Sequence, residues 1–144
     1  MTQRPSTRSD WLASHPPTAE RLTQTLAGVA QRTLAGEDFH RAVREFLDEF
    51  ALRGDKSSRV DAISEKPLLT GEPRQDAYLG ALAEHLAAMH GLERPSWSVE
   101  ADRFLPRFWF VSEVSGFRAI SISQAPAAFR RRNVFVPERS LHRV

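Results

Sequence analysis

The architecture of this chain follows from the stretch DFHRAVREFLDEF, residues 38–50. Its apolar side chains recur every three or four residues, the spacing that places them along one side of an α-helix. Charged side chains occupy the positions between them and predict an opposite side that faces water. The apolar stripe consists of Phe39, Ala42, Val43, Phe46, Leu47 and Phe50. This pattern predicts a helix over 38–53, which Gly54 ends.

A second helix is predicted just before this one. Thr18 follows two prolines and can cap a helix, because its side-chain oxygen can accept from the first free backbone N–H groups. Apolar residues then recur at helical spacing as far as Leu34, and Gly36 ends the pattern. We therefore expect a helix over 18–35 that forms an antiparallel hairpin with the helix at 38–53, the whole lying within residues 11–54.

After the hairpin the regular pattern is lost and then returns. Residues 55–72 are polar and turn-rich, so we interpret them as an irregular loop, in which Val60, Ala62 and Ile63 could form one helical turn. A third helix is predicted over 74–90. Gly91 follows it and is well suited to the left-handed conformation in which many helices end. Residues 73–144 are thus expected to be this helix followed by an aromatic-rich, basic part.

The aromatic-rich part does not have a single periodicity. A short β-hairpin within 108–123 is compatible with the sequence, and residues 117–123 satisfy both the strand and the helix spacing. We favour helix for 117–123 and leave strand as the alternative. Residues 1–10, at the other end of the chain, are polar without periodicity and predict a flexible tail.

Together these elements predict a mainly α, single-domain helical bundle over residues 11–144 that starts with an α-hairpin. A chain of 144 residues matches one compact domain that folds without disulfides. The absence of cysteine excludes a disulfide framework and thiolate metal sites, and no stretch approaches the ~18 apolar residues of a membrane span. We therefore expect a cytoplasmic protein. The core is expected to contain Phe46, Leu82, Leu86, Trp109 and Phe110.

No residue spacing typical of catalysis or of a cofactor occurs in the sequence. His85 and His90 are five residues apart, whereas two metal ligands on one helical face need a separation of four. The glycines are isolated, so no phosphate-binding loop can be formed, and no Gly-x-Ser-x-Gly motif is present. We predict no catalytic residue, no cofactor and no metal. An acid–base site built from residues distant in sequence stays open as a third functional alternative.

The C-terminal third is basic, since residues 101–144 carry eight arginines against Asp102, Glu113 and Glu138. Its most conspicuous feature is a run of three arginines beside aromatic residues, a combination that can hold phosphate and stack on a base. Consecutive residues of a helix point in different directions, so we expect at least one arginine to pair with a carboxylate at the core's edge. The candidate contact residues are Arg130, Arg131, Arg132, Asn133 and Phe135. Asn133 is expected in the left-handed conformation that ends a helix.

Two segments of the second half carry a resemblance. They are DAYLGALAEHLA at 76–87 and APAAFRRRNVFV at 125–136, with RFL at 103–105 and FWF at 108–110 between them. These segments are similar to parts of small uncharacterised actinobacterial proteins associated with neighbouring nucleotidyltransferase-like genes, in an arrangement that resembles a toxin–antitoxin pair. The resemblance implies an antitoxin-like protein that binds a partner, and it assigns no catalytic residue.

The leading functional hypothesis is therefore a non-catalytic cytoplasmic binding protein with a protein partner, which the resemblance suggests is a nucleotidyltransferase-like enzyme. The alternative is a nucleic-acid-binding regulator that uses Arg130–Arg132. The two hypotheses make different demands on these arginines, because a nucleic acid requires them exposed and unpaired.

Overall fold

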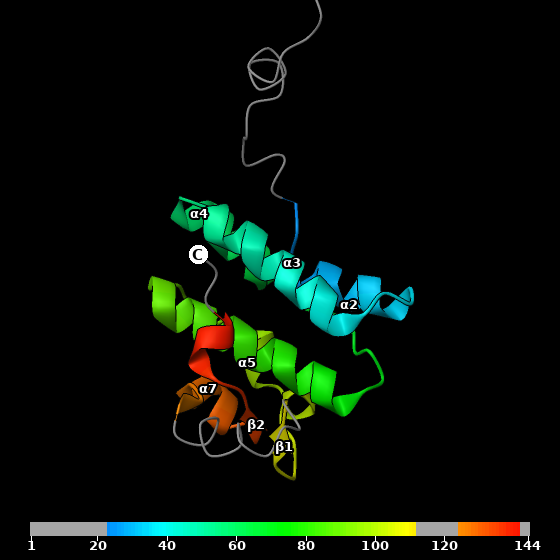
Figure 1. Cartoon of the computed structure of the whole chain (residues 1–144). Helices are drawn as coiled ribbons and strands as arrows, with labels where there is room; N and C mark the ends of the chain where they lie inside the picture. Colours follow the sequence, from blue (N-terminus) through cyan, green and yellow to red (C-terminus); the bar gives the residue numbers. More distant parts are fainter. Residues whose placement is uncertain (1–22, 112–123, 142–144) are drawn as a thin grey trace, which may run out of the picture.

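The computed structural model describes residues 23–111 and 124–141, and this part of the chain is mainly helical, as predicted. Figure 1 shows α2 (Leu26–Leu34), α3 (Phe39–Leu52) and α4 (Lys56–Ser64) on one side of the long helix α5 (Pro73–His90). The helix α7 (Ala127–Arg130) and the strands β1 (Trp109–Phe110) and β2 (Val134–Phe135) lie on the other side of α5, which is therefore covered from two directions. The predictions for the tail at 1–10 and for 117–123 fall outside the described residues.

The helix α3 forms where the apolar stripe predicted it. Asp38 caps it, since its carboxylate accepts the backbone N–H of Arg41 at 2.9 Å. All six stripe residues are buried. The reversal that precedes α3 uses Gly36, whose φ of 102° favours glycine. The predicted antiparallel packing of α3 on α2 is the main contact of this half of the molecule.

The helix α2 is shorter than the predicted 18–35. Residues 23–25 are not helical, and Thr25 caps the helix by accepting the N–H of Gly28 at 2.9 Å. The reason lies in α3, which holds the preceding backbone in an extended path: Gln24 N–H donates to Glu49 at 2.5 Å, and Arg53 donates to the Gln24 carbonyl at 2.8 Å. A single continuous helix over 18–35 was therefore a wrong prediction, although residues 18–22 lie outside the described part.

The prediction of an irregular loop over 55–72 was also wrong in its first half, which is the helix α4. Asp55 caps this helix by accepting the N–H of Ser58 at 3.0 Å. Of its nine residues only Ser58, Ala62 and Ile63 are buried. With so short an apolar face, α4 has almost no amphipathic signal, and capping together with packing stabilises it instead.

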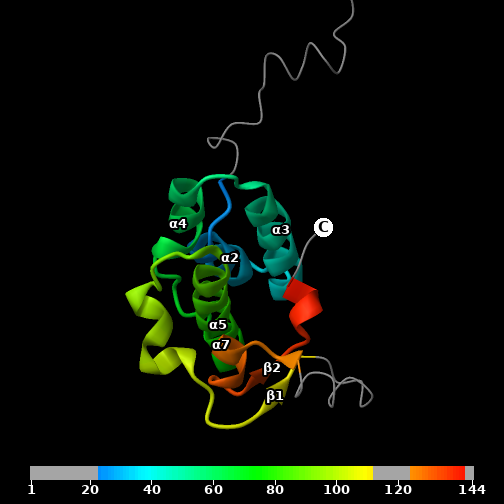
Figure 2. The same cartoon turned by 90° about the vertical axis from the view of Figure 1, so that its left-hand side faces the viewer.

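The central helix α5 is buried along most of its length, and it ends at Gly91 in the predicted left-handed conformation, with φ 64°. The short 3₁₀ helices η2 (Ser96–Val99) and η3 (Ala101–Arg103) pack against it (Figure 2). A Cβ added at Gly80 would lie 2.7 Å from the Cβ of Arg103, so glycine is required for this close approach.

Most of the possible β-hairpin within 108–123 lies outside the described residues, because the structure describes only 108–111 of it, and the strand found there has a different partner. Strand β1 (Trp109–Phe110) pairs in parallel with β2 (Val134–Phe135), which lies beyond α7 (Ala127–Arg130) in the chain. The last element is η4 (Glu138–Leu141). Because β1 lies at the rim of the molecule, Trp109 and Phe110 are only half-buried, which corrects their predicted core position. Phe46, Leu82 and Leu86 are in the core, as predicted.

Candidate functional site

Arg132, one of the predicted contact residues, is completely buried at 0% exposure. Its guanidinium contacts the Glu84 carboxylate at 2.5 Å. It also donates to the backbone carbonyls of Ser98 at 2.6 Å and Ala128 at 2.8 Å. The ring of Phe104 covers it, with 4.7 Å between the guanidinium carbon and the ring centroid. Arg132 therefore joins α5, η2 and α7 and is not accessible to a ligand.

Glu84, on α5, forms ion pairs with three arginines. Besides Arg132 it binds Arg131 and, at 3.1 Å, Arg94. Burial by itself raises the pKa of Glu84, but the hydrogen bonds from Arg132 and Arg131 outweigh it and lower the pKa to about 2. Glu84 is thus ionised at neutral pH and is the one carboxylate that these three arginines share. The expected pairing of the arginine run with a carboxylate at the core's edge is confirmed.

The remaining predicted contact residues are dispersed. Arg130 is exposed, and the described residues place no carboxylate within ion-pair distance of it. Asn133 adopts the predicted left-handed conformation, with φ 61°, and donates to the Leu105 carbonyl at 2.7 Å. Phe135 is buried and stacks on Phe110, with 5.2 Å between ring centroids. The structure does not bring the five residues together as one surface, and among them Arg130 alone is both exposed and unpaired within the described residues.

A different surface combines exposed cations and aromatic rings. It is a groove of about 220 Å³ between the start of α5 and the loop that leads into β1, and we call it the Arg74–Arg107 groove. Its lining residues are Glu72, Pro73, Arg74, Leu105, Pro106, Arg107, Phe108 and Trp109. The sequence does not indicate this groove, because its two walls come from segments far apart in the chain.

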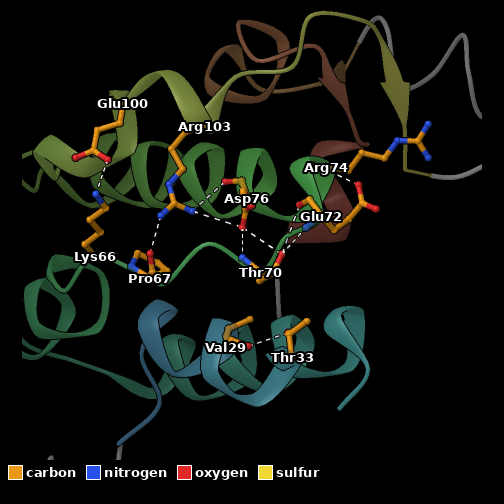
Figure 3. Close-up of polar contacts among 10 residues, drawn as sticks. All are labelled: Val29, Thr33, Lys66, Pro67, Thr70, Glu72, Arg74, Asp76, Glu100 and Arg103. Carbon is orange, nitrogen blue, oxygen red and sulfur yellow. Dashed lines mark hydrogen bonds and ion pairs between the residues drawn. The ribbon is translucent and has the colours of Figure 1, made fainter. Parts of the chain in front are cut away.

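The two arginines of this groove differ from Arg132 in being exposed. Within the described residues no carboxylate lies at ion-pair distance from Arg74 or Arg107. The Arg74 guanidinium carbon lies 5.7 Å from the centroid of the Trp109 ring. Figure 3 shows the Arg74 side chain extending toward β1 and away from the buried contacts of Asp76. The groove therefore presents two cations that can pair with groups from outside.

The apolar part of the groove is exposed as well. Phe108 is 70% exposed, although the edge of its ring contacts Phe135 at a centroid distance of 5.3 Å. Trp109 is half-buried and packs against Tyr78 of α5. Glu72, the acidic residue of the groove, accepts the backbone N–H of Arg74 at 3.2 Å and so caps α5. These contacts fix the aromatic wall while leaving one large apolar side chain in water.

A buried polar network holds the two walls of the groove together (Figure 3). Arg103, at the end of η3, donates to the Pro67 carbonyl at 2.7 Å and lies 3.9 Å from the Asp76 carboxylate. Asp76 in turn accepts the backbone N–H of Thr70 at 2.8 Å. The Trp97 ring stacks on the Arg103 guanidinium at 5.0 Å. Because Arg103 is fully buried, this network fixes the segment before α5 relative to the segment after η3.

A second groove, of about 210 Å³, lies between α3, α5 and η4. His85 and His90 both line it, despite their separation of five residues. Burial, and then the positive charge of Arg59, lower the pKa of His90. In the described ranges no group of three or more His, Cys, Asp or Glu side chains is arranged to hold a metal ion. The other described residues that line this groove are apolar.

None of the helices within residues 23–111 and 124–141 has the length and apolar character needed to cross a membrane. Comparison of the chain with protein-family models, with curated proteins and with solved structures found no match.

Proposed function

We propose that this chain is a non-catalytic binding protein that docks on a partner protein through the Arg74–Arg107 groove. The observation that carries the proposal is Phe108, a large aromatic side chain left 70% exposed beside Trp109 and two exposed arginines that form no ion pair with a described residue. Aromatic residues and arginine are enriched in the centres of protein interfaces. Burying Phe108 under a partner removes apolar surface from water, which favours association by about 25 cal/mol per Å².

The resemblance adds a more specific role to this proposal. An antitoxin-like protein neutralises or assists its partner by covering it, and the partner that the resemblance suggests is a nucleotidyltransferase-like enzyme in the same cytoplasm. The groove supports the general part of the proposal, namely binding. The identity of the partner rests on the resemblance of segments 76–87 and 125–136.

The alternative, a nucleic-acid-binding regulator, is supported by Arg130 alone among the three arginines. Arg132 is fully buried and cannot reach a phosphate, and Arg131 already contacts Glu84. An acid–base enzyme is the third proposal, and the groove that contains His85 and His90 is where its residues would be sought. We rank both below protein binding, because neither feature gathers several exposed groups in one place.

The test is affinity purification from the native cell with three forms of the full chain: wild type, Phe108→Ala and Leu52→Ala. Leu52 is the matched control, because it is 73% exposed at the end of α3 and lies outside the groove. We expect a protein that wild type and Leu52→Ala retain and that Phe108→Ala loses, identified by mass spectrometry. Equal retention of the same proteins by all three forms would contradict the proposal.

A further inference from the structure

We infer that the Arg74–Arg107 groove binds an acidic segment of the partner protein, in which an apolar side chain lies next to aspartate or glutamate. This inference rests on the proposed function, since it assigns the chemistry of the partner that docks in the same groove. It makes a stronger statement than binding alone, because it predicts which peptides the groove accepts and which it rejects.

The groove has more positively charged than negatively charged side chains. Its described lining contains two guanidinium groups and one carboxylate, and that carboxylate already accepts the backbone N–H of Arg74 at 3.2 Å. In contrast, Glu84 contacts each of Arg94, Arg131 and Arg132. Arg74 and Arg107 can therefore pair with an acidic surface from outside, since neither has an ion pair within the described residues, whereas every arginine of the Glu84 cluster already contacts a carboxylate.

Arg74 is oriented by the ring of Trp109. A guanidinium that lies over an aromatic ring is held in place by a cation–π contact, and its N–H groups remain free at the edges of its plane. Trp109 holds Arg74 in this way at 5.7 Å. Arginine in this arrangement binds a carboxylate through two parallel hydrogen bonds with little further loss of side-chain freedom. The geometry thus favours the carboxylate of aspartate or glutamate.

The groove also has an apolar wall. Pro73, Leu105, Pro106, Phe108 and Trp109 line the groove around the two cations. A free carboxylate or phosphate ion would leave these side chains in water, whereas a peptide that carries an apolar residue beside its acids covers them. The groove has a volume of about 220 Å³, which is the scale of a few side chains and not of a folded ligand.

Nucleic acid is the competing class of macromolecule, and the groove fits it less well. Nucleic-acid interfaces spread their cations over roughly 600–1,000 Å² even in single modules, and they bind along a phosphate backbone. The groove contains only two cations among its lining residues, and Glu72 stands beside them. A phosphate backbone would meet this carboxylate without finding further exposed partners in the groove.

The experiment selects displayed random peptides on the immobilised full chain and measures the affinity of the best synthetic peptide for matched variants. We expect enriched peptides to place Asp or Glu next to an apolar residue. Arg74→Glu and Arg107→Glu should each weaken the peptide at least about tenfold. Arg44→Glu is the control, because Arg44 is exposed on α3 and outside the groove, and it should leave the affinity unchanged. Thermal melting verifies that each variant is folded.

A charge exchange makes the test sharper. Replacing the acids of the selected peptide with lysine should abolish binding to wild type and restore it for the double variant Arg74→Glu, Arg107→Glu. The enriched peptides could instead lack acidic residues, bind the Arg74→Glu and Arg107→Glu variants as tightly as wild type, and still require Phe108. That result would overturn the inference and leave the proposed function standing. Failure to obtain any peptide that requires Phe108 would overturn both. Binding of single-stranded or duplex DNA to wild type, together with loss of that binding in Arg74→Glu and Arg107→Glu, would overturn the inference and assign the groove to nucleic acid.

Discussion

Arg132, in the arginine run at 130–132, and the pair Arg74 and Arg107 have opposite environments. In the run, Arg132 is fully buried and Arg131 is tied to the same carboxylate, Glu84. The two arginines of the groove are far apart in sequence, yet they line one surface and face water. Proximity along the chain therefore says little about which cations a ligand can reach. Burial and an internal carboxylate determine that instead.

The comparison also separates two kinds of stabilisation. A buried arginine must keep its hydrogen bonds and its counter-charge, because an uncompensated charge in the interior is very unfavourable. An exposed arginine keeps its hydration and contributes little to folding. Variants of the two groups should therefore differ first in stability and only then in binding.

The largest expected effect is that of Glu84→Gln. The substitution preserves shape but removes the counter-charge of the buried Arg132, so we expect the free energy of unfolding to fall by about 3 kcal/mol. Urea denaturation at pH 7 measures it. Glu100→Gln is the control, because Glu100 forms a 2.8 Å ion pair with Lys66 in which both side chains are largely exposed. The free energy of unfolding of Glu100→Gln should fall by less than about 1 kcal/mol. A similar loss for both variants would remove the distinction between the two regions.

The same carboxylate predicts a pH dependence. The pKa of Glu84 is about 2 in the folded chain, against an ordinary value of 4.5. A lowered folded pKa means that the stabilisation is complete above pH 4.5 and is lost as the pH falls toward 2. The difference in unfolding free energy between wild type and Glu84→Gln should therefore shrink across that interval. Denaturation at a series of pH values measures it, and a constant difference would contradict the assignment.

A smaller loss of stability is expected at Gly80, where η3 approaches α5. In Gly80→Ala the new Cβ would meet the Cβ of Arg103 at 2.7 Å and the Ser98 carbonyl at 3.1 Å. We expect a net loss of about 1–2 kcal/mol, since overpacking outweighs the better helix propensity of alanine. Gly54→Ala is the control, because a Cβ there meets nothing within 4 Å. If Gly80→Ala proved as stable as Gly54→Ala, the close packing of η3 would be refuted.

The smallest effect is that of Arg130→Ala. Because Arg130 is exposed, the unfolding free energy should change by less than about 0.5 kcal/mol. Filter retention of labelled DNA and RNA at ~150 mM salt should be negligible for this variant and for wild type alike. Steeply salt-dependent binding by wild type, with the logarithmic slope reduced by about one unit in the variant, would instead favour the nucleic-acid regulator.

Sequence periodicity was sufficient for the helices with a clear physical signal. The stripe from Phe39 to Phe50 predicted α3, and Gly91 marked the end of α5. It was insufficient for α4, which buries few side chains, and for the start of α2, where Thr18 and Thr25 are both plausible caps. Only the tertiary contacts of Gln24 with α3 show that the backbone is still extended before Thr25.

The candidate site was predicted less well than the fold, because it depends on contacts between distant segments. The sequence indicated that one arginine of the run would be paired, but Glu84 lies 47 residues from Arg131 and has no feature that marks it as the partner. The pairing of β1 with β2 is equally non-local. The groove arises from that pairing, since it places Trp109 and Phe108 beside the start of α5.

The central claim is that the buried Arg132 stabilises the fold while the groove arginines are left for binding. Urea denaturation of Arg132→Ala and Arg107→Ala under identical conditions tests it most directly. We expect Arg132→Ala to lose about 3 kcal/mol, because Glu84 and two backbone carbonyls lose a buried partner. Arg107→Ala should stay within about 0.5 kcal/mol of wild type. An Arg132→Ala chain as stable as wild type, or an Arg107→Ala chain destabilised to the same extent, would contradict the account.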